Sequence, residues 1–123
     1  MNPQFRPRAW LLASCPFCLK LRIALTELGI ADRFEFVVFE KGDDAEAELR
    51  RKLEAAGIEP SYPAVETAPG DWQTESDALI ARYARQEGRE PDDLPLLAYY
   101  LRGVFPKFIE LYKEHLARES ANA

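Results

Sequence analysis

Long hydrophobic runs and an excess of basic residues are both absent from this sequence. The apolar run from Ala9 to Ala13, which follows Arg6 and Arg8, is too short for the core of a signal peptide or for a membrane span. The 16 Lys and Arg residues are outnumbered by 21 Asp and Glu residues, and the net charge of −5 has the wrong sign for a phosphate-rich partner. We therefore expect a cytoplasmic protein with neither a membrane nor nucleic acid as a partner.

Residues that cross-link chains or hold metals are also scarce. The only two cysteines, Cys15 and Cys18, are three positions apart, and a structural disulfide is not expected at that spacing in a reducing compartment. A Cys-x-x-Cys pair supplies half of many zinc sites, but the second half is missing, because His115 is the single histidine and lies far along the chain. The scarcity favours redox use of the pair, with no metal site. A metal or cluster shared across a dimer and an inert pair are the alternatives.

The length of 123 residues, 47% of them hydrophobic, is enough for one core and too short for two ordinary domains. Hydrophobic spacing and turn residues divide the chain into alternating strands and helices. In order, the pattern predicts a strand at 10–13, a helix at 16–28, a strand at 34–39, a helix from 42–44 to just before Gly57, a strand at 64–66, a turn at Pro69-Gly70, a strand near Trp72 and a helix at 76–86.

This order indicates an α/β protein with a central sheet. The segment from Phe34 to Phe39 is dense in aromatic and β-branched residues. We expect this strand to lie parallel to the first strand and to be covered on both faces.

A helical tail follows a linker at 87–93. Pro106 suits the first turn of a second tail helix, and Gly103 marks a break before it. The apolar residues of the tail are spaced as on one side of a helix: Leu97, Leu101, Phe105, Phe108, Tyr112 and Leu116. Two helices that pack on the domain, or on a second copy of the chain in a homodimer, would bury this stripe.

The Cys-Pro-Phe-Cys segment lies at the expected start of the helix at 16–28. Unpaired N–H groups and the helix dipole stabilise a thiolate there, and such positions lower a cysteine pKa from about 8.5 to roughly 3.5–7.5. Pro16 suits the first helical position, where its missing N–H has no cost. We expect Cys15 to be solvent-accessible and ionised, and Cys18, one turn further along, to be buried and able to attack a mixed disulfide on Cys15.

With its strand, its Cys-Pro-Phe-Cys motif and the later Ser-Tyr-Pro-Ala-Val, the sequence resembles glutaredoxins and the N-terminal domain of glutathione transferases. The resemblance covers about Arg8 to Gly88 and implies a thioredoxin-like, glutaredoxin-type βαβαββα domain at 8–88, with two extra C-terminal helices in an extension at 89–123. It also implies glutathione as the cosubstrate, Cys15 as the nucleophile and Cys18 as the resolving thiol.

The same resemblance implies where glutathione binds. Pro63 occupies the place of a cis-proline that faces the active cysteine, and the backbone of Tyr62 would pair with the cysteinyl part of glutathione. Thr74-Glu75-Ser76-Asp77-Ala78-Leu79-Ile80 is similar to a transferase pattern in which Glu75 and Ser76 hold the γ-glutamyl group. A loop proline and a plain helix cap are the alternative readings of these two segments.

Three basic residues compete for the glycine carboxylate of glutathione. Lys41 lies where related proteins supply a cation. Lys20 and Arg22 are the other candidates, and we expect both of them to be solvated.

We therefore expect a glutathione-dependent thiol-disulfide oxidoreductase whose partners are glutathione and disulfide or glutathionylated substrates. Conjugation of electrophiles is less expected, because transferases continue into a helical domain that the given sequence does not contain. Two other functions remain open. One is a dimeric iron–sulfur cluster module that uses Cys15 and glutathione, and the other is a redox-inert adaptor that docks through its tail.

Overall fold

The computed structural model describes residues 5–121, and its elements follow the expected order. The elements are β1 (Arg8–Leu12), α1 (Pro16–Glu27), η1 (Ala31–Arg33), β2 (Glu35–Phe39), α2 (Asp44–Ala55), β3 (Ala64–Ala68), β4 (Asp71–Gln73), α3 (Ser76–Gln86), η2 (Pro91–Asp93), α4 (Pro95–Gly103) and α5 (Phe105–Ala121). The thioredoxin-like βαβαββα order with two C-terminal helices is thus confirmed. Within the described range, no helix combines the length and the hydropathy that a bilayer crossing requires.

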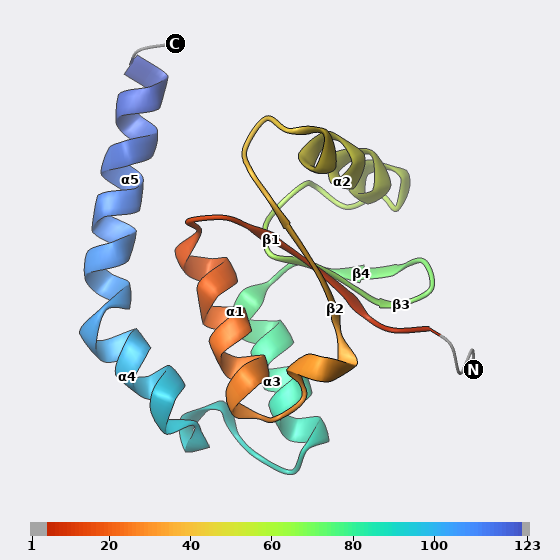
Figure 1. The fold of residues 1–123 in the computed structure, drawn as a ribbon, viewed down its shortest axis with the longest axis vertical. Coiled ribbons are helices and arrows are strands. Elements are labelled where there is room, and N and C mark those ends of the chain that lie inside the picture. Colours follow the sequence, from red (N-terminus) through yellow and green to blue (C-terminus); the bar gives the residue numbers. More distant parts are fainter. Residues whose placement is uncertain (1–4, 122–123) are drawn as a thin grey trace.

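The four strands form one mixed sheet in the order β2-β1-β3-β4. Strand β1 is parallel to β2 and antiparallel to β3, which is antiparallel to β4. Helices α1 and α3 lie on one face of the sheet and α2 lies on the other (Figure 1). The end of β1, the end of β2, the start of β3 and the end of β4 therefore meet at a single edge of the sheet.

Alternation along β1 divides the interior into two cores. Ala9 and Leu11 point toward α1 and α3, whereas Trp10 points toward α2. The buried residues of the first core include Leu21, Leu25, Val65, Leu79 and Ile80, and those of the second are Trp10, Phe39, Leu49, Leu53 and Ala64. Two covered faces fix the register of β1, because a slip by one residue would exchange the faces.

Strand β2 is parallel to β1 as expected, but the expectation that both of its faces are covered is wrong. Phe39 is buried, Phe36 and Val37 are half-buried, and Val38 is 63% exposed. The reason is position: β2 is the edge strand, and its Val38 borders a cavity between α1 and α5 instead of packing beneath a helix.

The loop between β2 and α2 is held by hydrogen bonds from its backbone to two carboxylates. The Asp43 carboxylate accepts hydrogen bonds from the backbone N–H groups of Glu46 (2.8 Å) and Glu40 (2.9 Å), and Glu46 Oε1 accepts from the N–H of Gly42 (2.7 Å). Gly42 adopts a φ of +88°, which glycine reaches without steric cost. These bonds fix the backbone on both sides of Lys41.

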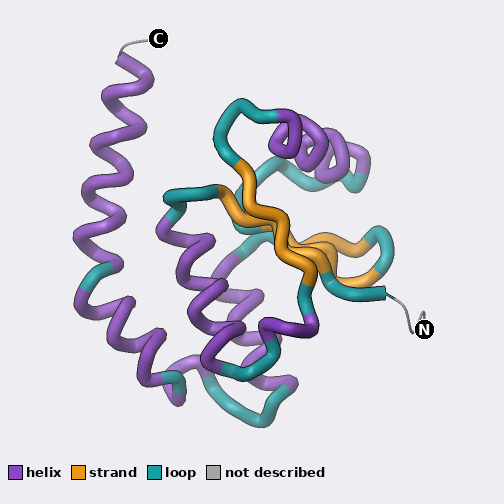
Figure 2. The backbone as a smooth tube through the Cα atoms, in the orientation of Figure 1, coloured by secondary structure: helices purple, strands orange, loops and turns teal. Residues whose placement is uncertain are grey.

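Helix α4 is anchored to α1, whereas α5 is held loosely. The Glu27 carboxylate accepts from the N–H groups of Leu96 (2.7 Å) and Leu97 (2.9 Å), and the Tyr100 hydroxyl donates to the Pro16 carbonyl (2.9 Å). In contrast, none of the residues of α5 is buried. The short break between α4 and α5 at Val104 is visible as a loop in Figure 2.

Candidate active site

Cys15 is the N-cap of α1, as the sequence predicts. Its backbone is extended (φ −95°, ψ 123°), Pro16 begins the helix, and the Cys15 sulfur accepts a hydrogen bond from the N–H of Cys18 at 3.4 Å. A thiolate at this position replaces the oxygen of an ordinary N-cap side chain. The same N–H groups that start the helix therefore stabilise negative charge on the sulfur.

A tight turn connects β1 to α1 and places Cys15 at the start of the helix. The N–H of Cys15 donates to the Leu12 carbonyl at 3.3 Å, and the N–H of Ala13 donates to the Phe39 carbonyl at 2.9 Å. Ser14 adopts a φ of +65°, in the left-handed region that residues other than glycine seldom occupy. The residue before the cysteine therefore holds a conformation of the kind that clusters at functional sites.

The two thiols are reduced, and their pKa values are shifted in opposite directions from the ordinary value. Hydrogen bonding from the Cys18 side chain and from backbone N–H groups lowers the pKa of Cys15 to about 7, although burial opposes this change. Hydrogen bonding to Cys15, burial and the Cys15 charge raise the pKa of Cys18 above its ordinary value. At neutral pH about half of Cys15 is thus thiolate, and Cys18 is the thiol that donates to it.

Cys15 is buried, and the expectation that it is solvent-accessible is wrong. Its exposed fraction is 5%, close to the 2% of Cys18. Tail residues lie near Cys15: Phe108 of α5 borders the cavity beside it, and the Cys15 charge adds to burial in raising the pKa of Tyr100 and of Tyr112. The chemical asymmetry of the two cysteines therefore arises from hydrogen bonding more than from exposure.

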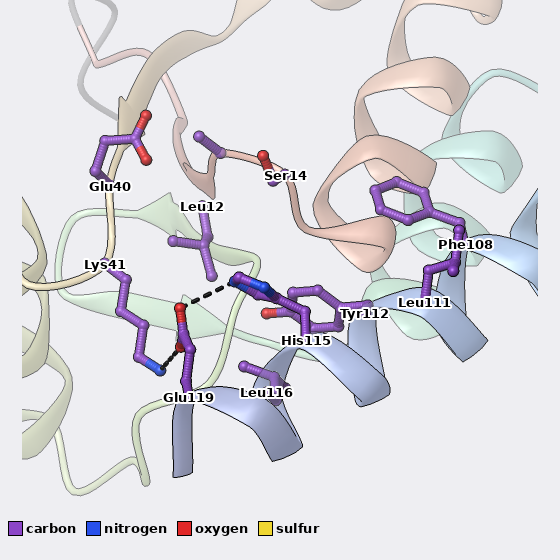
Figure 3. Close-up of a pocket in the computed structure, with 11 residues that line it drawn as sticks. Leu12, Ser14, Glu40, Lys41, Phe108, Leu111, Tyr112, His115, Leu116 and Glu119 are labelled. Atoms are coloured by element: carbon purple, nitrogen blue, oxygen red, sulfur yellow. Dashed lines mark hydrogen bonds and ion pairs between the residues drawn. The ribbon is translucent and has the colours of Figure 1, made fainter. Parts of the chain in front are cut away.

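Two adjoining cavities lie between the sheet edge and α5. One of about 220 Å³ borders Cys15, Cys18 and Val38, and one of about 550 Å³ extends from it toward α5. Leu12, Ser14 and Phe108 border both. Figure 3 shows the larger cavity, with apolar side chains on the α5 side and charged groups at its far end.

Lys41 lies at that charged end. Its ammonium is 3.0 Å from Glu119 Oε2, and the other oxygen of Glu119 is 2.9 Å from His115 Nε2 (Figure 3). Lys41 and then His115 hold the pKa of Glu119 below its ordinary value. His115 is 64% exposed, in agreement with its expected place on a surface helix.

The Tyr62-Pro63 peptide bond is cis, as the resemblance implies. Pro63 is buried and precedes β3, which pairs with the end of β1 through Ala64 and Trp10. The Tyr62 hydroxyl donates to Glu46 at 2.8 Å. This pairing places the backbone of Tyr62 at the same sheet edge as Cys15, while its contact with a ligand stays a prediction.

Glu75 and Ser76 begin α3 at that edge. Glu75 is the N-cap residue and is exposed, Ser76 is half-buried, and neither side chain makes a capping hydrogen bond in the described structure. The plain helix cap is therefore not observed, and the first N–H groups of α3 lack a side-chain partner.

Lys20 is buried, so the expectation that it is solvated is wrong, whereas Arg22 is exposed as expected. The Lys20 ammonium, with its side chain 5% exposed, lies 2.7 Å from Asp77 Oδ1 and 4.8 Å from the centre of the Phe105 ring. The Arg22 guanidinium lies 3.7 Å from the centre of the Phe36 ring. Arg22 borders the smaller cavity beside Cys15, and Lys41 is the one of the three cations that borders the larger cavity.

The described residues bring no three His, Cys, Asp or Glu side chains together in a way that could hold a metal ion.

A mixed four-stranded sheet with a Cys-x-x-Cys pair at the first helix defines a thioredoxin-like domain. Residues 14–86 match the family described as glutathione S-transferase, N-terminal domain, and the chain belongs to this family. No curated protein matches the chain.

Two solved structures resemble the chain. A possible glutathione S-transferase from Rhodopseudomonas palustris is 23% identical, with coverage of 64% of this chain and 38% of that one, at a TM-score of 0.46. Glutathione transferase Omega 2S from Trametes versicolor, in complex with 2,4-dihydroxybenzophenone, is 18% identical, with coverage of 84% and 43%, at a TM-score of 0.48. The chain thus spans less than half the length of either structure.

Sequence reasoning missed the residues that the tail contributes around Cys15. Tyr100, Phe108 and Tyr112 belong to the tail segment whose apolar stripe was recognised, but a stripe does not reveal which surface it covers. Glu119 follows Leu116 on the same face of α5, but its residue type carries no sequence signal that connects it with Lys41.

The hydrogen bond between the two thiols generates the first prediction. Cys18→Ala removes the donor and should raise the pKa of Cys15 from about 7 toward its ordinary value, whereas Cys18→Ser keeps a hydroxyl donor and should leave it low. The measurement is the pH dependence of thiolate absorbance in the ultraviolet. Equal pKa values in the two variants would contradict the assigned cause.

Proposed function

We propose that this protein is a glutathione-dependent thiol-disulfide oxidoreductase that acts on disulfide or glutathionylated substrates in the cytoplasm. The observation that carries the proposal is the Cys15 thiolate at the N-terminus of α1, with a pKa of about 7, next to a protonated Cys18. A thiol with a pKa near ambient pH is the best attacking group for disulfide exchange. In this proposal residues 8–88 form the catalytic domain and 89–123 its extension.

The first step is attack by the Cys15 thiolate on the glutathione sulfur of a mixed disulfide. A new bond forms between Cys15 and glutathione, and the substrate sulfur leaves with the electron pair of the broken bond and takes a proton. The substrate is reduced to its thiol, and the oxidation is retained as the Cys15–glutathione disulfide. The positive end of α1 stabilises the thiolate both as reactant and as the final leaving group.

Two routes complete the cycle. In one, the thiolate of a second glutathione attacks the bound glutathione sulfur, which releases oxidised glutathione and the Cys15 thiolate. In the other, Cys18 loses its proton and attacks Cys15, which releases reduced glutathione and leaves a Cys15–Cys18 disulfide that two further glutathione molecules reduce. The backbone nitrogen of Cys18 lies 3.4 Å from the Cys15 sulfur, and Cys18 carries the only other thiol of the sequence.

Groups at the sheet edge support the binding of glutathione. The backbone of Tyr62, ahead of Pro63, can pair with the cysteinyl unit. The open N–H groups of α3 and the Ser76 hydroxyl suit the γ-glutamyl carboxylate, while the Glu75 carboxylate can accept from the γ-glutamyl ammonium. Lys41 can pair with the glycine carboxylate.

The test is turnover of a small glutathione mixed disulfide and of a protein disulfide, each coupled to NADPH through glutathione reductase. Cys15→Ser should abolish both activities, because a serine hydroxyl is almost entirely protonated at neutral pH. Cys18→Ser should retain most of the activity on the mixed disulfide, since free glutathione can resolve the intermediate, and should lose much of the activity on the protein disulfide. A Cys18→Ser variant that is inactive on the mixed disulfide, beside an active Cys15→Ser, would reverse the assignment.

A double variant tests the γ-glutamyl site. Replacing both Glu75 and Ser76 by alanine should raise the KM for glutathione by at least about tenfold, because each charge-assisted hydrogen bond contributes roughly 1.5–3 kcal/mol. The control is Glu54→Ala, which removes an exposed carboxylate at the far end of α2. An unchanged KM in the double variant would show that glutathione does not bind at the start of α3.

A further inference from the structure

Helix α5 lies across the opening between Cys15 and Lys41, and it is fastened at its far end by charge. Glu119, in its last turns, contacts Lys41 at 3.0 Å and His115 at 2.9 Å. Nearer to Cys15, Phe108 borders both cavities (Figure 3). The same helix therefore covers the nucleophile and occupies the cation proposed to bind glutathione.

The attachment of α5 is weak compared with that of α4. In α5 the apolar side chains that face the domain, including Phe108, Tyr112 and Leu116, are only half-buried, whereas α4 buries Leu97 and Tyr100. The break at Val104 follows Gly103. A Cβ added to Gly103 would have no neighbouring atom within 4 Å, so the chain is not closely packed there. The Lys41 and Glu119 side chains are 62% and 43% exposed, and ion pairs between exposed groups contribute little to stability. Phe105, the first residue of α5, packs against the rings of Phe17 and Tyr100, so the part of α5 beyond Phe105 can leave the site without disturbing either core.

We propose that α5 is a strap that closes over Cys15, and that Glu119 holds it shut by occupying the place at Lys41 that the glycine carboxylate of glutathione takes. This inference rests on the proposed function, because it requires that Lys41 bind glutathione. Binding of the ligand and exposure of the nucleophile are then a single event. Glutathione displaces Glu119, and the part of α5 beyond Phe105 moves away and uncovers the sulfur.

The charges around the large cavity support competition. Glu40 and Glu119 both border it with Lys41, so an incoming carboxylate meets two like charges and one ammonium. An ammonium has three donors and could contact a second carboxylate, but the repulsion from Glu119 at the same point would oppose it. Removal of the Glu119 charge should therefore favour an external carboxylate at Lys41.

The experiment compares the wild type with Glu119→Gln, Lys41→Met and the double variant. The matched control is Glu114→Gln, which lies on the same helix and makes no ion pair with any residue that the structure describes. One readout is the rate of alkylation of Cys15 by iodoacetamide without glutathione, well above the pKa of Cys15, so that thiolate content is equal in all proteins. The other readout is the KM for glutathione in the coupled assay.

The two single variants should agree in one readout and differ in the other. Both break the ion pair, so both should speed the alkylation of Cys15 by at least about threefold. Glu119→Gln should lower the KM for glutathione by a similar factor, whereas Lys41→Met should raise it. In the Lys41→Met background, Glu119→Gln should leave the KM unchanged, because the contested cation is gone.

Three results separate failure of this inference from failure of the proposed function. If the wild type turns over glutathione and Glu119→Gln equals Glu114→Gln in both readouts, the strap is wrong and the oxidoreductase stands. The strap is also wrong if Glu119→Gln speeds alkylation but leaves the KM unchanged. If no protein turns over glutathione, wild type included, the oxidoreductase function and the role of Lys41 are both wrong.

Discussion

The charge on the Cys15 sulfur depends on the first turn of α1, and the other features of the site depend on that charge. Pro16 starts the helix without an N–H of its own, the Cys18 N–H points at the sulfur, and the Cys18 thiol donates to it. Burial would otherwise keep Cys15 protonated. A nucleophile that is buried and still about half ionised at neutral pH is thus possible because these donors replace the water that the fold excludes.

The two C-terminal helices limit access to the reactive Cys15 sulfur. Helix α4 is joined to the active-site helix by the hydrogen bond from Tyr100 to the Pro16 carbonyl, so its position is coupled to the start of α1. Helix α5 continues from it and places Phe108 beside Cys15, while Glu119 reaches the loop that carries Lys41. Strong attachment at one end and weak attachment at the other are the properties expected of a lid on a preformed site.

The parts of the site that follow from local rules could be predicted from sequence, and the parts that depend on distant contacts could not. The N-cap role of Cys15, the position of Pro16 and the parallel strand after α1 follow from short-range preferences and hydrophobic spacing. The exposure of Val38 depends on where β2 lies in the sheet, and the burial of Lys20 depends on α3 and α5. Ser14 has a left-handed backbone that its residue type does not favour, so only the turn itself reveals it.

The most direct test of the central claim is to identify the sulfur that reacts first. The reduced wild-type protein is mixed with oxidised glutathione, samples are quenched with acid over time, and their peptides are mapped by mass spectrometry. We expect the earliest adduct to be glutathione on Cys15, followed by a Cys15–Cys18 disulfide as Cys18 resolves it. Early glutathione on Cys18 with Cys15 still free, or no adduct on either cysteine, would contradict a nucleophile created by the N-terminus of α1.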